Sequence, residues 1–232
     1  MNTAMKIWND LLNLFYPNLC LLCKEPLVEG EEQICLHCLC DLPRTGFFAL
    51  EDNPVAQLFL GKSDFTAATA FLHYEKGGRV QKLIHSLKYY DNKELAYQLG
   101  RLAALEYKKS SLFTTTDLLL PVPLHPQRLR QRGYNQSEWI ARGISSVTHQ
   151  PIDVTSLRRI KKTETQTRKQ VYERWQNVQH IFSLAHPEAL QGKHLLLIDD
   201  VVTTGDTLIA CASPLLTIPN TKVSFFGLST VV

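Results

Sequence analysis

The stretch Leu195–Thr207, with the sequence LLLIDDVVTTGDT, joins an apolar run to two acids and a loop rich in threonine and glycine. The run Leu195–Ile198 shows no alternation, which is typical of a strand buried on both faces of a parallel sheet. The loop Thr203–Thr207 precedes a helical pattern, and backbone N–H groups gathered at a helix N-terminus suit a phosphate. Asp199 and Asp200 supply carboxylates that accept hydrogen bonds from ribose hydroxyls. The stretch therefore predicts a site for a phosphorylated sugar at the carboxyl edge of a parallel sheet.

Apolar patterns on either side of this stretch predict further strands and helices. Strands that alternate with helices imply right-handed crossovers and a mostly parallel sheet, so the fold class is α/β. The expected strands cover residues 66–74, 118–122, 195–199 and 222–230, and the expected helices begin near Gly78 and cover 94–108 and 137–147.

The composition is that of a soluble globular protein. Of 232 residues, 44% are hydrophobic and 20% charged, which excludes a disordered, collagen-like or disulfide-only scaffold. The longest apolar runs are far shorter than the ~20 residues of a membrane span. Polar residues such as Asn9, Asp10 and Asn13 interrupt the start of the chain, so no signal peptide is expected. We expect a cytoplasmic protein, in which cysteine pairs bind metal rather than form disulfides.

Charge is segregated along the chain. Residues 1–60 contain three basic and eight acidic residues, a net charge of −5, whereas residues 124–180 contain eleven basic and four acidic residues, a net charge of +7. This contrast suggests two units and an anionic ligand for the second. The expected segments are an amphipathic helix (1–16), a zinc-ribbon module (17–45), a linker (46–64) and an α/β domain (65–232).

Two Cys-x-x-Cys pairs, separated by eleven residues, lie in the segment 17–45. Four thiolates complete the tetrahedral shell of a structural zinc ion, and this polar stretch has no apolar core that would bury free cysteines. His37 and Cys40 lie close enough to compete for the place of the fourth ligand, and an iron–sulfur cluster is the minority alternative. The expected zinc ligands are Cys20, Cys23, Cys35 and Cys38.

Two basic segments are the other candidate parts of the site. The first, residues 121–137, follows a predicted strand and contains Arg128, Arg130 and Arg132. Because this segment lies at the same sheet edge as the acids, its arginines suit a pyrophosphate. The second, residues 158–177, lacks apolar periodicity and is expected to be a mobile loop. Three interpretations of this loop are open: a solvent-exposed loop that binds nothing, a lid that covers the site, or a binding surface for a nucleic-acid backbone.

The motifs resemble those of the ComF-type competence proteins, a family with a phosphoribosyltransferase-like domain. One hallmark, PVPLxxxRxxxRG-aromatic-NQ, matches Pro121–Gln136, and the phosphate loop matches that of type I phosphoribosyltransferases. The resemblance implies a type I phosphoribosyltransferase-like parallel sheet flanked by helices, with a small N-terminal four-cysteine zinc ribbon. A second hallmark, in the basic loop, is matched by Thr163, Gln166, Arg174 and Asn177.

The resemblance also implies a function. We expect a ComF-type protein that handles incoming single-stranded DNA during DNA uptake, binds Mg²⁺ with phosphoribosyl pyrophosphate and has a DNA-uptake helicase as partner. The alternatives are an active phosphoribosyltransferase with an unidentified base or amine acceptor, and a non-catalytic sensor of phosphoribosyl pyrophosphate. We expect Asp199 and Asp200 to bind the ribose diol, and Arg128 and Arg132 to bind the pyrophosphate. The 5′-phosphate is expected to be bound by Thr203, Thr204, Gly205, Asp206 and Thr207.

Overall fold

The computed structural model describes residues 17–160 and 181–232. The main sheet has four strands in the order β1-β6-β5-β2, and every pairing in it is parallel. This confirms the predicted parallel sheet. The amphipathic helix expected at 1–16 and most of the basic loop lie outside the described residues. The strands are β1 (Ala68–His73), β2 (Leu118–Pro121), β5 (His194–Val202) and β6 (Lys222–Thr230).

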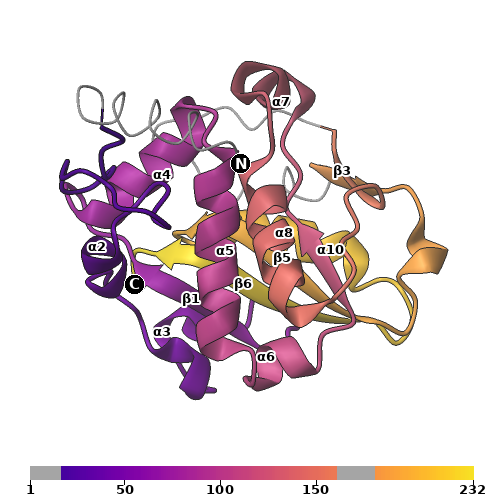
Figure 1. Cartoon of the computed structure of the whole chain (residues 1–232). Coiled ribbons are helices and arrows are strands. Elements are labelled where there is room, and N and C mark those ends of the chain that lie inside the picture. The colour runs from indigo at the N-terminus through magenta and orange to yellow at the C-terminus, as the bar shows by residue number, and fades with distance from the viewer. Residues whose placement is uncertain (1–16, 161–180) are drawn as a thin grey trace.

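Helices cover both faces of the sheet (Figure 1). One face carries α4, α5 and α8, whose apolar side chains join one core cluster with the four-cysteine module. The other face carries α10 and the short α3, which contribute to a second cluster. The longer helices are α4 (Arg79–Tyr89), α5 (Lys93–Tyr107), α8 (Gln136–Thr148) and α10 (Asp206–Leu215), and the short ones are α2 (Leu36–Cys40), α3 (Pro54–Gln57), α6 (Ser111–Thr114) and α7 (Pro126–Arg132), with 3-10 turns at Phe47–Ala49 and Pro187–Ala189.

The central strands are buried on both sides, as the continuous apolar run predicts. In β5, Leu196 and Ile198 belong to the cluster under α5 and α8, whereas Leu195 and Leu197 belong to the cluster under α10. All four are fully buried. Because successive strand residues point to opposite faces, an unbroken apolar run fills both cores at once.

Helices α5 and α8 cross in close contact through two glycines. A Cβ atom on Gly100 would lie 2.2 Å from the Ile140 carbonyl oxygen, and one on Gly143 would lie 2.0 Å from the Tyr97 carbonyl oxygen. No side chain fits at either position, so the two backbones meet directly. This contact fixes the position of α8, whose first turn forms part of the site described below.

Residues 46–64, expected to be a linker, pack against the sheet instead. Asn53 caps α3 by accepting from the Val55 and Ala56 backbone N–H groups, and it donates to the Ala68 carbonyl of β1. Phe59 is fully buried, with its ring centroid 4.3 Å from that of Phe225. The glycines and Pro54 are exposed, and the buried apolar residues between them anchor the segment to the sheet.

Two other boundaries differ from the expectation. Strand β5 continues to Val202, so the two acids lie inside the strand rather than after it. Arg158 and Arg159, expected in a mobile loop, belong to β3 (Leu157–Arg159), which pairs antiparallel with β4 (Phe182–Leu184). Leu157 of β3 and Phe182 of β4 are both buried, and this burial stabilises the pairing of the two strands. In the described part of the chain, no helix has both the length and the apolar character needed to cross a membrane.

Candidate functional site

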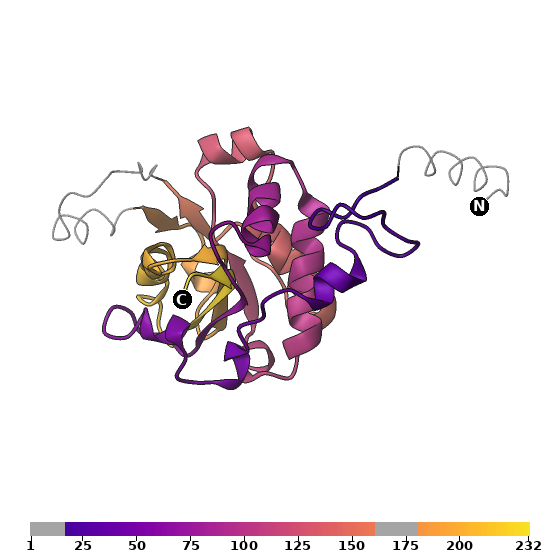
Figure 2. The same ribbon diagram turned by 90° about the vertical axis from the view of Figure 1, so that its left-hand side faces the viewer.

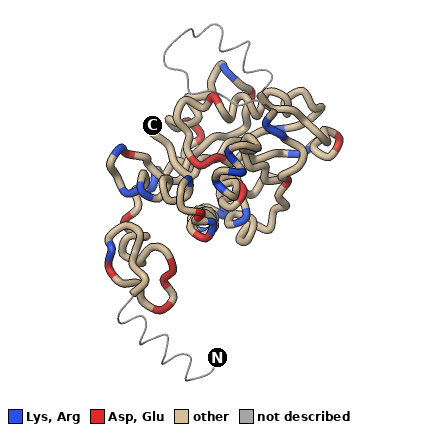
Figure 3. The backbone as a smooth tube through the Cα atoms, turned by 90° about the horizontal axis from the view of Figure 1, so that it is seen from above, with Lys and Arg blue, Asp and Glu red and all other residues tan. Residues whose placement is uncertain are grey.

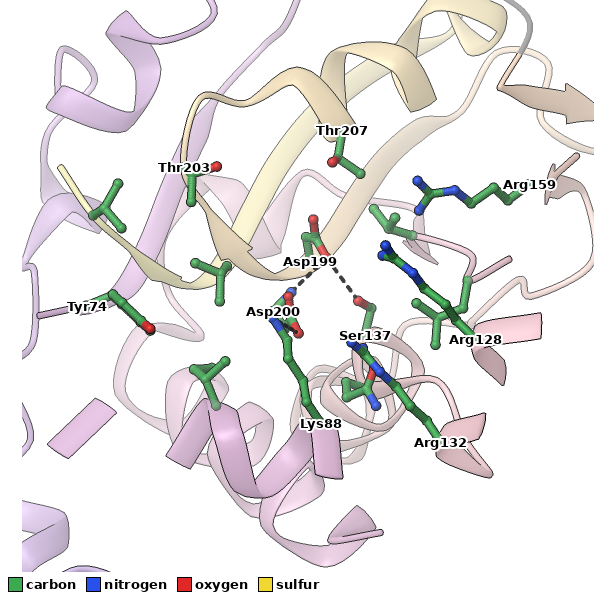
Figure 4. A pocket seen from close by; sticks show the side chains of 16 residues that line it. Tyr74, Lys88, Arg128, Arg132, Ser137, Arg159, Asp199, Asp200, Thr203 and Thr207 are labelled. Atoms are coloured by element: carbon green, nitrogen blue, oxygen red, sulfur yellow. Dashed lines mark hydrogen bonds and ion pairs between the residues drawn. The ribbon is translucent and has the colours of Figure 1, made fainter. Parts of the chain in front are cut away.

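A cavity of about 370 Å³ lies at the carboxyl edge of the sheet. Its walls come from the end of β5, the last turns of α4, helix α7, the start of α8 and the loop before α10 (Figure 4). The structure brings together six of the residues expected to bind the ligand, namely Arg128, Arg132, Asp199, Asp200, Thr203 and Thr207.

The two acids form the floor of this cavity. Asp199 Oδ1 accepts hydrogen bonds from the Asp200 backbone N–H at 2.9 Å and from Ser137 Oγ at 3.3 Å. Asp200 Oδ2 forms an ion pair with Lys88 Nζ at 3.1 Å. No hydrogen bond from a described residue reaches Asp199 Oδ2 or Asp200 Oδ1. Each carboxylate thus keeps one oxygen that can accept a hydrogen bond from a ligand.

The environment of Asp199 disfavours its charged form. Burial raises the pKa of Asp199 to about 7, and the neighbouring Asp200 carboxylate adds to this. The Asp200 backbone N–H, Lys88 and the Ser137 hydroxyl act in the opposite direction. Because desolvation and a like charge dominate, the acid pair holds less negative charge near neutral pH than two surface carboxylates would.

The Thr203–Thr207 loop leads from β5 into α10. Gly205 has a φ of +78° at the N-cap of α10, a conformation that glycine adopts without steric cost. The Phe59 ring lies against Gly205, 2.7 Å from where a Cβ would be, so the segment before β1 supports the loop. Thr203, Thr204 and Asp206 are exposed, and Asp206 lines a smaller hollow of about 30 Å³ beside the main cavity. Thr203, Thr204, Gly205 and Thr207 line the same hollow, so the loop as a whole surrounds it.

Helix α7 presents arginines on the wall facing this loop. The helix starts at His125, whose side chain accepts from Gln127 N, and it ends at Gly133, with a φ of +75°. Arg128 and Arg132 line the cavity, one helical turn apart, whereas Arg130 is exposed. Residues four apart share a helix face, which accounts for this division.

Four further lining residues were not assigned to the ligand from the sequence. Lys88 follows Ile84 by one turn, and both side chains face the cavity from α4. Arg159 comes from β3, and Gln136 and Ser137 come from the first turn of α8. The sequence signal for Lys88 was its position four residues after the apolar Ile84, which places both on the same face of the helix. The expected loop residues Thr163, Gln166, Arg174 and Asn177 lie outside the described residues.

The four predicted zinc ligands come together in the N-terminal module. The Sγ atoms of Cys20, Cys23, Cys35 and Cys38 all lie within 4.8 Å of one another. Cys23 Sγ and Cys35 Sγ are 3.7 Å apart, close to the ~3.8 Å edge of a tetrahedron with Zn–S bonds of ~2.3 Å. The donor set therefore fits a single tetrahedral ion. His37 and Cys40 are not part of this cluster.

The module lies beside α4 and α5 (Figure 2), and polar side chains join it to these helices. Asn92 Nδ2 donates to Gln33 Oε1 at 3.0 Å, and Arg79 pairs with Asp41. Figure 3 shows acidic residues along the module. Arg44 adds a link from the end of the module to Glu106 of α5, at 2.8 Å. These polar contacts, together with the buried Leu22, Ile34 and Leu42 in the core cluster shared with the helices, position the module.

Proteins similar to this chain carry names from DNA utilisation and competence. The DNA utilization protein YhgH of Escherichia coli O157:H7 is 30% identical over 223 residues, covering 88% of this chain and 92% of that protein. Competence protein F of Haemophilus influenzae is 28% identical over 65% of this chain and 66% of its own length. Competence protein ComFC of Bacillus subtilis is 35% identical over 43% of this chain and 38% of its own length.

Among solved structures, adenine phosphoribosyltransferase from Leishmania tarentolae aligns with 69% of this chain and 91% of its own, at 12% identity and a TM-score of 0.38. The allosteric regulatory enzyme of purine biosynthesis aligns with 56% of this chain and 25% of its own, at 20% identity and a TM-score of 0.37. No protein-family model matches. The assignment therefore comes from the sequence relatives, among which YhgH matches over most of both chains, and they show that this protein belongs to the ComF family.

Proposed function

We propose that this protein handles incoming single-stranded DNA during DNA uptake and binds phosphoribosyl pyrophosphate together with Mg²⁺ in the cavity at the sheet edge. The observation that best supports a ligand of this class is the arrangement around one cavity. An acid pair, a threonine-rich loop at a helix N-terminus and two arginines face the same space. A sugar diol, a monophosphate and a pyrophosphate each find a matching set of groups there.

Each group would bind one part of the ligand. The free oxygens of Asp199 and Asp200 would accept hydrogen bonds from the two ribose hydroxyls. The Thr203–Thr207 loop, at the N-terminus of α10, would hold the 5′-phosphate through backbone N–H groups and hydroxyls. Arg128 and Arg132 would pair with the pyrophosphate, because a guanidinium forms two parallel hydrogen bonds to such an anion.

The chemistry of the cavity fits a magnesium ion that arrives with the ligand. Mg²⁺ keeps several waters and is bound mainly through substrate phosphates rather than an all-protein cage. The two carboxylates of the cavity already hold Lys88, Ser137 and a backbone N–H group, so they offer no cage. Pyrophosphate oxygens would therefore hold the ion, which would neutralise part of their charge.

The role in DNA handling is supported by the names of the relatives and by the basic middle of the chain. Residues 124–180 have a net charge of +7, and a phosphate backbone binds such a segment with release of counterions. Single-stranded DNA is the expected polymer, and a DNA-uptake helicase is the expected protein partner. DNA binding should weaken steeply with salt, whereas the compact sugar phosphate should respond less.

Calorimetric titration of phosphoribosyl pyrophosphate with Mg²⁺ tests the site. We expect binding to wild type and to a control, Asp64→Asn, which alters an exposed acid outside the cavity. The double variant Asp199→Asn, Asp200→Asn should lose it. Absence of binding to wild type refutes the proposed ligand. Release of pyrophosphate on adding a base or an amine would identify an active transferase, and binding without turnover would identify a sensor.

Anisotropy of a labelled oligothymidylate, measured across salt concentrations, tests the DNA role. The affinity should fall linearly on a double-logarithmic plot against salt concentration. If no binding occurs even at low ionic strength, direct DNA handling by this chain is refuted.

A further inference from the structure

Lys88 forms an ion pair with Asp200 at the bottom of the cavity. We propose that Lys88 is a positioning residue, whose ammonium holds Asp200 in the orientation that receives the ligand's sugar hydroxyls. The inference rests on the proposed function for its ligand, and it assigns Lys88 a role distinct from that of the arginines. Figure 4 shows Lys88 reaching Asp200 from α4, while Arg128, Arg132 and Arg159 lie along the other wall.

The ion pair is shielded from water. Lys88 Nζ lies 3.1 Å from Asp200 Oδ2, and the two side chains are only 25% and 12% exposed. Water and salt screen a partly buried ion pair less than a surface pair, so the attraction between the two charges is stronger and restrains the positions of both side chains. Lys88 uses one oxygen of Asp200 and leaves Oδ1 for a ligand.

The position of Lys88 is itself set by the loop between α7 and α8 and by the first residue of α8. The carbonyl oxygen of the preceding residue, Leu87, accepts a hydrogen bond from Tyr134 Oη at 2.5 Å and another from Gln136 Nε2 at 3.1 Å. Tyr134 and Gln136 are both buried. Buried polar groups with satisfied hydrogen bonds fix the last turn of α4 in one arrangement.

The same glutamine reaches the arginine wall. Gln136 Oε1 accepts from Arg132 Nη1 at 2.9 Å. A continuous set of contacts therefore runs from Arg132 through Gln136 and the Leu87 carbonyl to the backbone that carries Lys88, and from Lys88 to Asp200. This set holds the group facing the pyrophosphate and the group facing the diol at a fixed separation.

Charge balance gives Lys88 a second effect. Asp199 and Asp200 are adjacent, and Asp200 raises the pKa of Asp199 whereas Lys88 lowers it. Among the described residues, Arg159 of β3 and Cys211 of α10 also interact with the Asp199 charge, and burial and that charge raise the pKa of the Cys211 thiol. Arg128 and Arg132 of α7 line the same cavity. Removal of Lys88 should therefore move the Asp199 titration to higher pH.

The test compares Lys88→Met with Lys82→Met, a control that removes an exposed lysine from the same helix. Carbon-13 NMR of the aspartate carboxyls, without ligand, follows the Asp199 titration. We expect an upward shift in Lys88→Met and none in the control. Calorimetry with phosphoribosyl pyrophosphate and Mg²⁺ should show affinity reduced about 10- to 100-fold in Lys88→Met, the range for loss of a hydrogen bond to a charged group.

A third readout distinguishes positioning from general damage to the fold. Propylammonium added to Lys88→Ala should restore part of the lost affinity, because it supplies the missing cation, and propanol should not. Wild-type affinity in Lys88→Met with an unchanged pH profile overturns the inference. If wild type binds no ligand while the Asp199 titration still shifts, the proposed function fails and the coupling of Lys88 to the acid pair is supported.

Discussion

Replacement of Gly143 by alanine tests whether the α5–α8 contact is as close as the structure shows. The new Cβ would lie 2.0 Å from the Tyr97 carbonyl oxygen and 2.7 Å from the Arg101 backbone nitrogen. A carbon–oxygen contact needs about 3.3 Å, so the helices must separate by roughly 1.3 Å. Overpacking costs about 1–3 kcal/mol, and because both clashing atoms belong to the backbone we take the upper part of this range, about 2–3 kcal/mol. Alanine recovers about 1 kcal/mol through its helix propensity, which leaves a net loss of about 1–2 kcal/mol.

Thermal unfolding, followed by circular dichroism, measures the effect. For a chain of this length, each kcal/mol shifts the midpoint by about 2–4 °C, so we expect Gly143→Ala to unfold about 2–8 °C below wild type. Ser146→Ala is the control, because this exposed α8 residue gains helix propensity without a clash and loses only its side-chain hydrogen bond to the Gly143 carbonyl. A midpoint for Gly143→Ala at or above that of wild type would refute the reasoning, since propensity alone predicts stabilisation.

Three further predictions concern the module, the loop support and the acid pair. The purified protein should contain about one zinc ion per chain, which Cys20→Ser should lose and Cys40→Ser should retain by elemental analysis. Phe59→Ala should destabilise by about 3–5 kcal/mol in urea unfolding and weaken phosphoribosyl pyrophosphate binding, whereas exposed Leu60→Ala should do neither. At pH values above 7, Asp199→Asn should have a higher thermal unfolding midpoint than wild type, and below about pH 4 this difference should vanish. The reason is that folding raises the pKa of this acid from 3.8 to about 7, so its charged form destabilises the folded state. Equal midpoint differences at both pH values would contradict the raised pKa.

The parallel sheet and the site edge were predictable because their signals are local. A continuous apolar run such as Leu195–Ile198 can only be buried on both sides, and the acids and threonine loop follow it directly in sequence. The four cysteines were predictable for a similar reason, because two Cys-x-x-Cys pairs a short distance apart in sequence are a local signal, and their thiols do lie together.

The remaining features depend on contacts between distant segments. From the sequence, Gly100 and Gly143 are only glycines that weaken a helix. Their role in the close contact of α5 and α8 is evident only when the two helices are packed together. The segment 46–64 shows turn residues, and only the fold reveals that Phe59 fills the space beneath Gly205. Lys88 lies more than a hundred residues from its partner Asp200, so no local pattern could pair them.

These long-range contacts indicate how the site is assembled. Phe59 supports the Thr203–Thr207 loop from the face of α10, while α8, fixed on α5 by Gly143, supplies Ser137 to Asp199 from the opposite face. The candidate ligand site is thus formed where the two cores meet at the end of β5. Movement of either layer would change the distance between the loop and the acid pair. It follows that variants in the helix crossing should affect ligand affinity as well as stability, although Gly143 lies outside the cavity.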